Sequence, residues 1–518
     1  MNKRETANDA PGKTAAAAPD RLATGNTGLD SILEGGFPAN RLYLVEGDPG
    51  TGKTTLALRF LLEGARRGEP VLYVTLSETR EEIVDVAASH GWSLEGVNLY
   101  ELIPPEDSLK VETQYTIFHP SEVEFGETTT AVLDEVERIQ PRRVVFDSLS
   151  EMRLLARDPL RYRRQILALK QYFAGRQCTV LLLDDRSSTG SDLQVQSIAH
   201  GVVELEHLAL DYGAERRRLR VVKLRGSKYR GGFHDFKIET GGVAVYPRLV
   251  AAEHRQEFAR EMITSGVAQL DALLGGGLDR GTSTLILGPA GTGKSSIAAQ
   301  FAATAAERGE HAASFLFDEG VNTYLSRATG LGRDMKRQVE SGHMSIQQVD
   351  PAELSPGEFA HFVRRAVERD GARVVVIDSL NGYLQAMPDE RFLTVQMHEL
   401  LTYLNQQGVV TLLVVAQHGF MGANMGTPVD VSYLADTVLM LRFFEARGAV
   451  RRAISVVKKR TGYHENTIRE MRMSGGGITV GEPLKDFQGV LTGVPTSTNE
   501  PPPLFEQRNK PEEHDADA

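Results

Sequence analysis

Two octapeptides in this chain combine the residue types that bind phosphate groups. Residues 47–54 read GDPGTGKT and residues 288–295 read GPAGTGKS, and each follows an apolar run and precedes a helix-forming segment. Glycines in such a loop let backbone N–H groups close around phosphate oxygens, and the start of the following helix adds positive potential. We therefore expect Lys53 and Lys294 to reach the outer phosphates of a bound nucleotide.

Each octapeptide ends on a hydroxyl side chain, Thr54 in the first and Ser295 in the second, which we expect to ligate Mg²⁺. A single octapeptide of this kind could be an unrelated glycine turn. Two copies in matching strand and helix contexts argue against that alternative. The sequence therefore predicts two P-loops that bind ATP with Mg²⁺, one in each half of the chain.

Four carboxylates stand where predicted strands end. Asp147 and Asp378 each close a β-branched run, where a carboxylate can hold the water shell of Mg²⁺; the alternative is a residue that only caps the next segment. Glu78 and Glu319 close the second strand of each half, from which a carboxylate could polarise the water that attacks a γ-phosphate. The alternative for both glutamates is a solvated charge at a strand end.

Two basic pairs alternate along a strand and therefore share one face: Lys223 with Arg225, and Lys458 with Arg460. Turning both cations of a pair into the core would cost several kcal/mol. An exposed, self-repelling strand is one alternative. The other is a pair that neutralises the phosphates of a nucleotide bound by a neighbouring subunit, which requires a ring of subunits.

These motifs belong to an internal repeat. The same offset, 241 positions, separates Gly47 from Gly288 and Glu78 from Glu319. Other pairs follow with slightly shorter offsets, 231 for Asp147 and Asp378 and 235 for Lys223 and Lys458, so a few short insertions and deletions separate the halves. We predict two homologous halves at about residues 20–250 and 258–490.

Short apolar runs alternate with helical patterns in each half, which predicts an α/β fold with a mostly parallel sheet and helices on both faces. In the first half we expect strands at Arg41–Glu46, Val71–Thr75, Arg143–Phe146 and Thr179–Leu183. We expect helices at Lys53–Arg66 and Pro159–Phe173.

Composition limits the class of protein. The 518 residues are 41% hydrophobic and 25% charged, as in a globular protein, and 58 Lys and Arg against 69 Asp and Glu give a net charge of -11, which weighs against DNA as a partner. Cys178 is the one cysteine, so no internal disulfide is expected, and neither an export signal nor a membrane helix is read from the sequence. These features favour the cytoplasm.

The predicted division of the chain has five parts. Residues 1–20 are expected to be a disordered N-terminal segment, and 491–518 an acidic, proline-containing flexible tail. Residues 21–250 and 261–490 are the two predicted ATPase domains. Residues 251–260 (AAEHRQEFAR) are predicted to be a polar, helical linker between them.

Taken together, these motifs resemble the KaiC clock ATPases and autokinases, a family with tandem RecA-like P-loop domains. The resemblance rests on the two P-loops, on GLDSILEGG at residues 28–36, on the Asp-Ser strand ends, on the Lys-x-Arg strands and on residues 445–474, EARGAVRRAISVVKKRTGYHENTIREMRMS. It covers about residues 25–490. It implies a double-ring homohexamer with ATP and Mg²⁺ between subunits, slow hydrolysis, and serine or threonine autophosphorylation in the second ring, in a protein that signals to other proteins.

The resemblance also implies site residues. As catalytic residues it implies Glu78, Asp318 and Glu319. As metal ligands it implies Thr54, Ser295 and Asp318. For ATP in the first domain it implies Gly47, Gly50, Thr51, Gly52, Lys53, Thr54, Thr55, Ser89, Asp147, Lys223, Leu224, Arg225 and Ser227. For ATP in the second domain it implies Gly288, Gly291, Thr292, Gly293, Lys294, Ser295, Ser296, Asp378, Lys458, Lys459 and Arg460.

This chain departs from the family pattern at several positions. Where the family has an acidic pair, Ser77 precedes Glu78 and Asp318 precedes Glu319, so we expect the first site to be the weaker hydrolase. The adjacent serine and threonine phosphosites fall on Ser432 and Tyr433; Ser432 and Thr427 are the candidate phosphosites. Leu331 replaces an aromatic residue that the family often places beside adenine, whereas Trp92 is retained in the first half.

Two other functions fit the same P-loops. A RecA-like motor for DNA repair or unwinding shares this core, but the acidic charge and the lack of an aromatic and basic stripe in the sequence weigh against it. A scaffold that binds ATP in order to assemble, with little turnover, is the second rival, and Ser77 favours it for the first ring.

Overall fold

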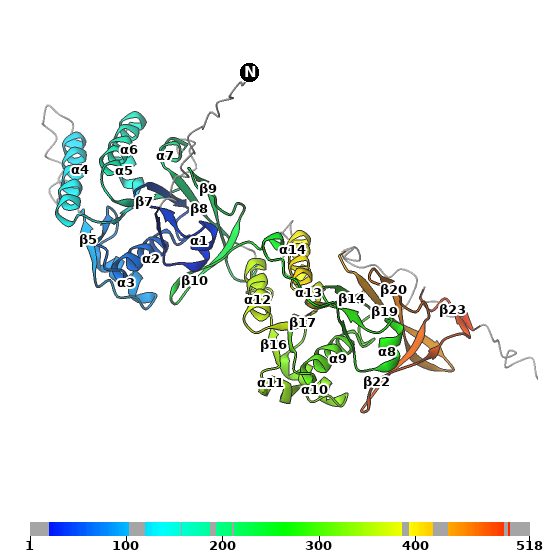
Figure 1. Ribbon diagram of the computed structural model, residues 1–518. Helices are drawn as coiled ribbons and strands as arrows, with labels where there is room; N and C mark the ends of the chain where they lie inside the picture. Colours follow the sequence, from blue (N-terminus) through cyan, green and yellow to red (C-terminus); the bar gives the residue numbers. More distant parts are fainter. Residues whose placement is uncertain are drawn as a thin grey trace, which may run out of the picture. The chain divides into compact units, whose positions relative to one another are not determined.

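The computed structural model describes residues 20–102, 120–156, 158–186, 193–209, 212–385, 393–417, 434–491 and 496–497. The chain divides into two compact units, Met1–Arg248 and Leu249–Ala518 (Figure 1). No helix in the described part is long and apolar enough to cross a membrane.

The first unit follows the expected alternation of strands and helices. Its strands are β1 Arg21–Leu22, β2 Phe37–Pro38, β3 Leu42–Gly47, β4 Val71–Thr75, β5 Val97–Glu101, β6 Arg143–Asp147, β7 Thr179–Asp185, β8 Gly201–Leu208, β9 Arg216–Leu224, β10 His234–Glu239 and β11 Gly242–Tyr246. Its helices are α1 Thr27–Ile32, α2 Lys53–Arg66, α3 Arg80–Ser89, α4 Pro120–Ile139, α5 Leu149–Ala156, α6 Pro159–Ala174 and α7 Leu193–Ile198.

The second unit repeats this order. Its strands are β12 Met262–Ile263, β13 Leu278–Asp279, β14 Ser283–Gly288, β15 His311–Leu316, β16 Met344–Gln348, β17 Ala372–Asp378, β18 Val410–Ala416, β19 Thr437–Ala446, β20 Ala449–Lys459, β21 Arg469–Ser474, β22 Gly477–Pro483, β23 Phe487–Gln488 and β24 Thr496–Ser497. Its helices are the 3₁₀ helix η2 Ala251–Glu253, then α8 Ala268–Leu273, α9 Lys294–Glu307, α10 Val321–Gly330, α11 Met335–Glu340, α12 Pro356–Glu368, α13 Leu380–Gln385 and α14 Leu393–Gln406.

Each unit contains a nine-stranded sheet, counted over the described residues, and the two sheets have the same strand order. It is β11-β10-β9-β8-β3-β7-β6-β4-β5 in the first unit and β22-β21-β20-β19-β14-β18-β17-β15-β16 in the second. The strands from β8 to β5, and from β19 to β16, pair in parallel, whereas the remaining edge strands pair antiparallel. The predicted fold class is confirmed.

Helices cover both faces of each sheet (Figure 1). In the first unit, α1, α2 and α3 pack on one face, while α4, α5, α6 and α7 pack on the other. In the second unit, α8, α9, α10 and α11 share one face, and α12, α13 and α14 the other. Each P-loop leads from the end of β3 or β14 into α2 or α9 on that face.

The sequence patterns placed most of the first unit's core elements to within one or two residues. Val71–Thr75 and Lys53–Arg66 match β4 and α2 at both ends, and α6 extends the predicted Pro159–Phe173 by one residue. Strand β7 continues past the predicted Thr179–Leu183 to Asp185. The apolar run ends at Leu183, but the backbone pairing continues, because Asp184 and Asp185 pair with Glu46 and Gly47 of β3.

The prediction of a helical linker is wrong beyond its first turn. Only Ala251–Glu253 forms a 3₁₀ helix, and residues 254–260 have no regular structure. The backbone N–H of Gln256 donates to the carbonyl oxygen of Gln406 at 3.2 Å, and Phe258 packs closely against Gly281 and Gly408. These contacts hold the segment in a non-helical conformation against the second unit.

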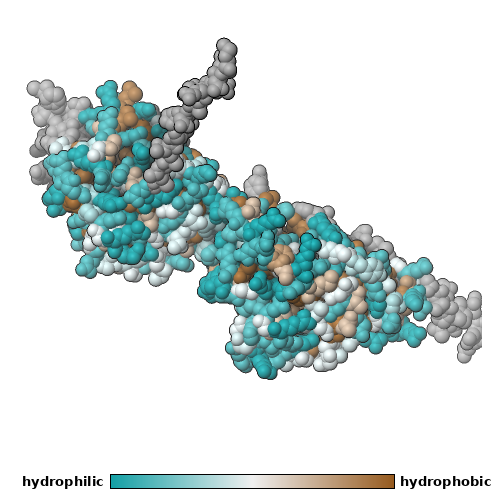
Figure 2. All heavy atoms as spheres, viewed as in Figure 1, coloured by the Kyte–Doolittle hydropathy of each residue, from teal (hydrophilic) through white to brown (hydrophobic). Residues whose placement is uncertain are grey.

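The surface of both units is mostly polar on the face that Figure 2 shows, and an apolar patch lies over α5 and α6 of the first unit. Leu154 of α5 is 70% exposed and Leu160 of α6 is 62% exposed. Contiguous exposed apolar side chains are typical of interaction surfaces.

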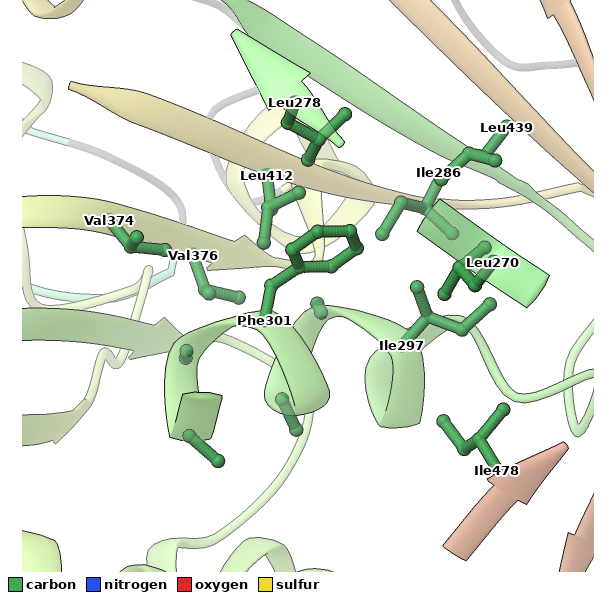
Figure 3. Close-up of a cluster of buried hydrophobic side chains, with 14 of the residues drawn as sticks. Leu270, Leu278, Ile286, Ile297, Phe301, Val374, Val376, Leu412, Leu439 and Ile478 are labelled. Atoms are coloured by element: carbon green, nitrogen blue, oxygen red, sulfur yellow. The ribbon is translucent and has the colours of Figure 1, made fainter. Parts of the chain in front are cut away.

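The core of the second unit is centred on the P-loop helix α9. Figure 3 shows Phe301 directed from α9 toward Val376 and Leu412 of the sheet, with Ile297 one turn away facing Leu270. Phe301 is fully buried. Because α9 begins at the P-loop, this packing fixes the direction from which the loop meets a ligand.

Replacing Phe301 by Ala should therefore destabilise the second unit by about 3–5 kcal/mol, since truncation removes buried contacts and leaves a cavity. Hydrogen-exchange mass spectrometry in urea, followed on peptides from β14 and β17, would measure the loss. Val395→Ala is the matched control, because Val395 is 58% exposed on α14 and its truncation should change stability by less than about 0.5 kcal/mol. Equal effects of the two substitutions would contradict the central role of Phe301.

Candidate functional site

The P-loop of the first unit joins the carboxyl end of β3 to the first residue of α2. Gly50 and Gly52 adopt positive φ angles of 80° and 93°, a conformation that L-residues with side chains rarely take. A Cβ at Gly52 would also lie 2.7 Å from the Cδ1 of Ile238. Glycine is therefore required there, and the turn exposes the N-terminal N–H groups of α2, which suit phosphate oxygens.

Lys53 begins α2 and is buried, with its Nζ folded back over the loop. Nζ donates to the carbonyl oxygens of Gly47 at 2.8 Å and Asp48 at 3.0 Å. It also forms an ion pair with the Oδ1 of Asp185 at 2.7 Å, at the end of β7. A phosphate that reached Lys53 would compete with Asp185 for its charge.

The hydroxyl of Thr54 and the carboxylate of Asp147 meet as predicted, since the Oγ1 of Thr54 donates to the Oδ2 of Asp147 at 2.9 Å. Tyr73 of β4 donates to the same oxygen at 2.5 Å. Burial raises the pKa of Asp147, and the bonds from Tyr73 and Thr54 oppose that rise. This hydroxyl and carboxylate are the donor types that Mg²⁺ accepts, and they lie beside a phosphate loop, so the residues fit Mg·ATP.

Glu78 stands half-buried just beyond β4, and its Oε2 is buried with no hydrogen-bond partner among the described residues. Burial raises its pKa, and the negative charges of Asp147, Glu82 and Asp185 add to the rise. A carboxylate with a raised pKa is a stronger base for a proton from water. Ser77, its neighbour, is exposed.

The second P-loop has the same geometry, with positive φ angles of 78° at Gly291 and 103° at Gly293. Lys294 is buried, and its Nζ donates to the carbonyl oxygen of Pro289 at 2.8 Å. Burial lowers its pKa to about 8, against the opposing effect of Asp378. Ala416 holds the register position that Asp185 holds in the first unit, so this lysine lacks the equivalent acidic partner.

Asp378 of the second unit accepts a hydrogen bond from the hydroxyl of Ser295, while its Oδ2 is buried with no hydrogen-bond partner in the described part of the chain. The hydroxyl of Ser379 donates to Asp318, which brings the predicted acid into the same site. A free, buried carboxylate oxygen beside a hydroxyl and a second carboxylate also fits a hydrated Mg²⁺.

Glu319 has a different environment from Glu78. Its Oε2 accepts a hydrogen bond from an Nη of Arg327 at 2.7 Å, within an ion pair. Burial raises the pKa of Glu319, and the positive charge of Arg327 opposes the rise. The described contacts therefore favour Glu78 as the more readily available base, although Ser77 had suggested the reverse.

The basic pairs lie away from their own P-loops. Lys223 donates to the carbonyl oxygen of Gln196 and Arg225 to that of Ser197, both in α7. Lys458 donates to the carbonyl oxygen of Ala435, and Arg460 pairs with Asp436 at 3.4 Å. By strand register, Lys223 and Lys458 lie level with Leu44 and Leu285 near the start of β3 and β14, whereas the P-loops follow the other end of these strands.

Lys459, also predicted to bind ATP, points inward. Its side chain is 1% exposed, and its Nζ donates to the carbonyl oxygens of Leu274 at 2.7 Å and Gly277 at 3.2 Å, with Asp279 3.5 Å away. In this conformation its ammonium group holds the turn after α8.

Several further predicted residues lie beside the P-loops or near α3. Thr55 and Ser296 are buried at the starts of α2 and α9. The Oγ1 of Thr55 lies 3.3 Å from the Nε2 of His90, which follows the exposed Ser89. By the offset of 241, His90 is the counterpart of Leu331.

Other predicted residues have lesser roles or are not described. Leu224 is buried and Ser227 half-buried after β9. Trp92 packs against His90 with ring centroids 4.9 Å apart. Ser432, Thr427 and Tyr433 lie outside the described residues.

Comparison with known proteins agrees with this geometry. The family model described as "ATPase: KaiC" matches residues 22–250 and 263–485, one match in each unit. The chain belongs to the KaiC family of ATPases. The predicted resemblance is therefore confirmed, and with it the tandem RecA-like architecture.

Individual KaiC relatives align along nearly their whole lengths. The "Circadian clock oscillator protein KaiC" of Picosynechococcus sp. is 28% identical over 484 residues, 90% of this chain and 91% of the relative. The protein of the same name from Synechococcus elongatus is 28% identical over 486 residues, 92% of each. The "Circadian clock protein KaiC3" of Synechocystis sp. is 26% identical over 491 residues, 92% of this chain and 95% of the relative.

Sequence reasoning missed the residues that surround the predicted ones in this KaiC-family chain. Tyr73, Asp185 and Arg327 contact the predicted lysine or carboxylates but belong to no motif. Ser379 belongs to an Asp-Ser strand end, but its bond to Asp318 was not predicted. The repeat offsets do show that the two halves differ at these places, as with Asp185 and Ala416. They do not show which side chain each residue meets.

A buried acidic cluster also distinguishes the first unit. Glu46, Asp184 and Glu204 lie side by side across β3, β7 and β8, where the second unit has Leu287, Val415 and Met440. Gln196 donates to Glu46 at 2.5 Å, and arginines pair with the other two acids. Burial raises the pKa of Glu46 to about 7, and the charges of Glu204 and Asp184 add to the rise.

This raised pKa predicts a pH dependence of stability. A carboxyl with a folded-state pKa above its unfolded value of 4.5 binds its proton more tightly when folded, so stability falls as pH rises from about 4.5 to 7. Glu46→Gln should remove that loss. The free energy of unfolding of the variant minus that of wild type should therefore be about 2 kcal/mol larger at pH 8 than at pH 5. Urea unfolding followed by the fluorescence of Trp92, which lies in the first unit, would measure it. Parallel pH profiles for the two proteins would contradict the assignment.

Proposed function

We propose that this KaiC-family chain is an ATP-hydrolysing switch that binds Mg·ATP at both P-loops. The observation that carries the proposal is the recurrence, in both units, of a buried P-loop lysine, a hydroxyl and an aspartate at the carboxyl edge of the parallel strands, with one strand between the P-loop strand and the strand that carries the aspartate. Mg²⁺, held by Thr54 and Asp147 or by Ser295, Asp378 and Asp318, would neutralise phosphate charge.

The glutamates supply the acid–base chemistry of this proposal. Water attacks the γ-phosphorus, the bond from that phosphorus to the bridging oxygen breaks, and Glu78 or Glu319 accepts the proton that water loses. Lys53 and Lys294 hold the phosphates in line for this attack. ADP and inorganic phosphate are the products.

We propose assembly into a ring from the first unit's basic pair, with six copies as the resemblance to the KaiC family implies. Lys223 and Arg225 bond to backbone carbonyls, and neither forms an ion pair with a carboxylate of the described residues, so their charge is available to a neighbour's phosphates. The exposed Leu154 and Leu160 on α5 and α6 offer apolar area for such a contact. Serine autophosphorylation in the second unit is proposed at Ser432, with Thr427 as a minor site.

The relatives are named circadian clock proteins. We place this chain accordingly in a timing or signalling role, in which slow turnover changes the conformation presented to protein partners. Stimulation of ATP turnover by single-stranded DNA would instead indicate a RecA-like motor. Intact rings that bind ATP but release no phosphate would indicate the scaffold.

The first glutamate gives the sharpest test of hydrolysis. Glu78→Gln should lower total phosphate release at least tenfold, since positioned general bases contribute 10²- to 10⁴-fold and Glu78 has the free, buried oxygen. Glu319→Gln should cost less, because Glu319 is held by Arg327. Steady-state phosphate release at saturating Mg·ATP measures both. Undiminished turnover in the double variant would refute the role of both glutamates.

Intact mass spectrometry after incubation with Mg·ATP should show one added phosphate in most wild-type chains and only a minor fraction, on Thr427, in Ser432→Ala. In the transfer, the serine oxygen bonds to the γ-phosphorus, ADP leaves, and Glu319 or Asp318 accepts the proton. Tyr433→Phe is the matched control and should keep the phosphate, because a tyrosyl oxygen lies too far from its backbone for the same path. Native spectra of the same samples count the subunits. Undiminished phosphate incorporation in Ser432→Ala would contradict the assignment.

A further inference from the structure

Arg327 and Glu319 form an ion pair inside the second candidate site. Glu319 lies just after β15, and Arg327 is the seventh residue of α10, from which it reaches back to the Oε2 of Glu319 at 2.7 Å. The two side chains are 27% and 24% exposed. The pair therefore joins the candidate base to the helix that follows it.

The guanidinium is fixed by more than this carboxylate. It lies over the ring of the fully buried Tyr324, with 5.1 Å between the guanidinium carbon and the ring centroid. Its charge also acts on Asp378, beside the P-loop. Arg327 is thus a cation within the carboxylate set of the site and not a solvated residue on the outer face of α10.

The first unit shows that the fold does not require this pair. By the offset of 241, Val86 of α3 stands where Arg327 stands in α10, and each is the seventh residue of its helix. Among the described residues, Glu78 consequently has no cation paired with it, and its Oε2 is buried without a hydrogen-bond partner. The same strand, turn and helix form in both units. The ion pair is therefore not needed for the fold, and its effect is on the charge and position of Glu319.

We propose that Arg327 is a positioning residue that holds Glu319 in this ion pair and thereby restrains ATP hydrolysis at the second site. The inference rests on the proposed function, in which Glu319 accepts a proton from the attacking water. To do so, the carboxylate must leave Arg327 or share its charge with it. The ion pair stabilises the resting arrangement of Glu319, whereas Glu78 has no such restraint.

An ordinary surface ion pair is the alternative, and such pairs contribute little to stability and nothing to turnover. Arg364 and Glu368 on α12 provide a matched example, 3.1 Å apart and 22% and 42% exposed. Neither lies at a P-loop. A substitution at Arg364 therefore reports what the loss of a half-exposed arginine does elsewhere in the same unit.

The test uses the full chain in a Glu78→Gln background, so that the second site dominates the remaining turnover. Arg327→Met keeps the length of the side chain and removes its charge. We expect it to raise kcat for phosphate release about three- to tenfold with KM for ATP unchanged within about twofold. Arg327→Lys should return kcat toward the parent value, and Arg364→Met should leave it unchanged.

Adding Glu319→Gln to Arg327→Met should abolish the gain. A fall in kcat with Arg327→Met, a change confined to KM, or an equal gain with Arg364→Met would overturn the proposal. Glu319→Gln alone, in the Glu78→Gln background, tests the role of Glu319 as the proton acceptor separately from the restraint by Arg327. If it leaves phosphate release unchanged, Glu319 is not the base, and the proposed function of this site fails whatever Arg327 does.

Discussion

Burial of one central parallel strand is the constraint on which the rest of each unit depends. β3 and β14 pair with a strand on each side and are buried over their whole lengths. The chain that follows each of them can therefore reach the surface only at the strand's carboxyl end. The P-loop must turn there through left-handed glycines and enter α2 or α9 at its lysine. Asp147 and Asp378 end β6 and β17. They lie near the P-loop because the carboxyl ends of parallel strands meet at the same edge of a sheet.

Within that shared frame, the two units distribute charge differently. In the first unit the P-loop lysine has an acidic partner, Asp185, and the candidate base Glu78 pairs with no cation in the part of the chain that the structure describes. In the second unit the described residues give the lysine no such partner, and the candidate base Glu319 pairs with Arg327. A pair of sites with the same backbone can therefore favour different steps, because electrostatic interactions in partly buried sites depend on a few close groups.

A second contrast concerns the sheet beside the P-loops. The acidic cluster around Glu46 is buried in the first unit, and its partners come from β9, α5 and α7. The second unit fills the same register with apolar side chains. Buried acids that are hydrogen-bonded and paired add pH sensitivity that an apolar core lacks.

Much of this protein could be read from the sequence, because the decisive signals are local or repeated. The P-loops, the 241-residue offset, the apolar runs and the Lys-x-Arg strands predicted the two α/β units and the resemblance to KaiC. The ion pairs Lys53–Asp185 and Arg327–Glu319, the cluster around Glu46 and the non-helical linker were decided only by the tertiary structure. Each depends on which distant residues the strand register and helix packing bring together. Local sequence patterns do not indicate contacts between residues that are far apart in the chain.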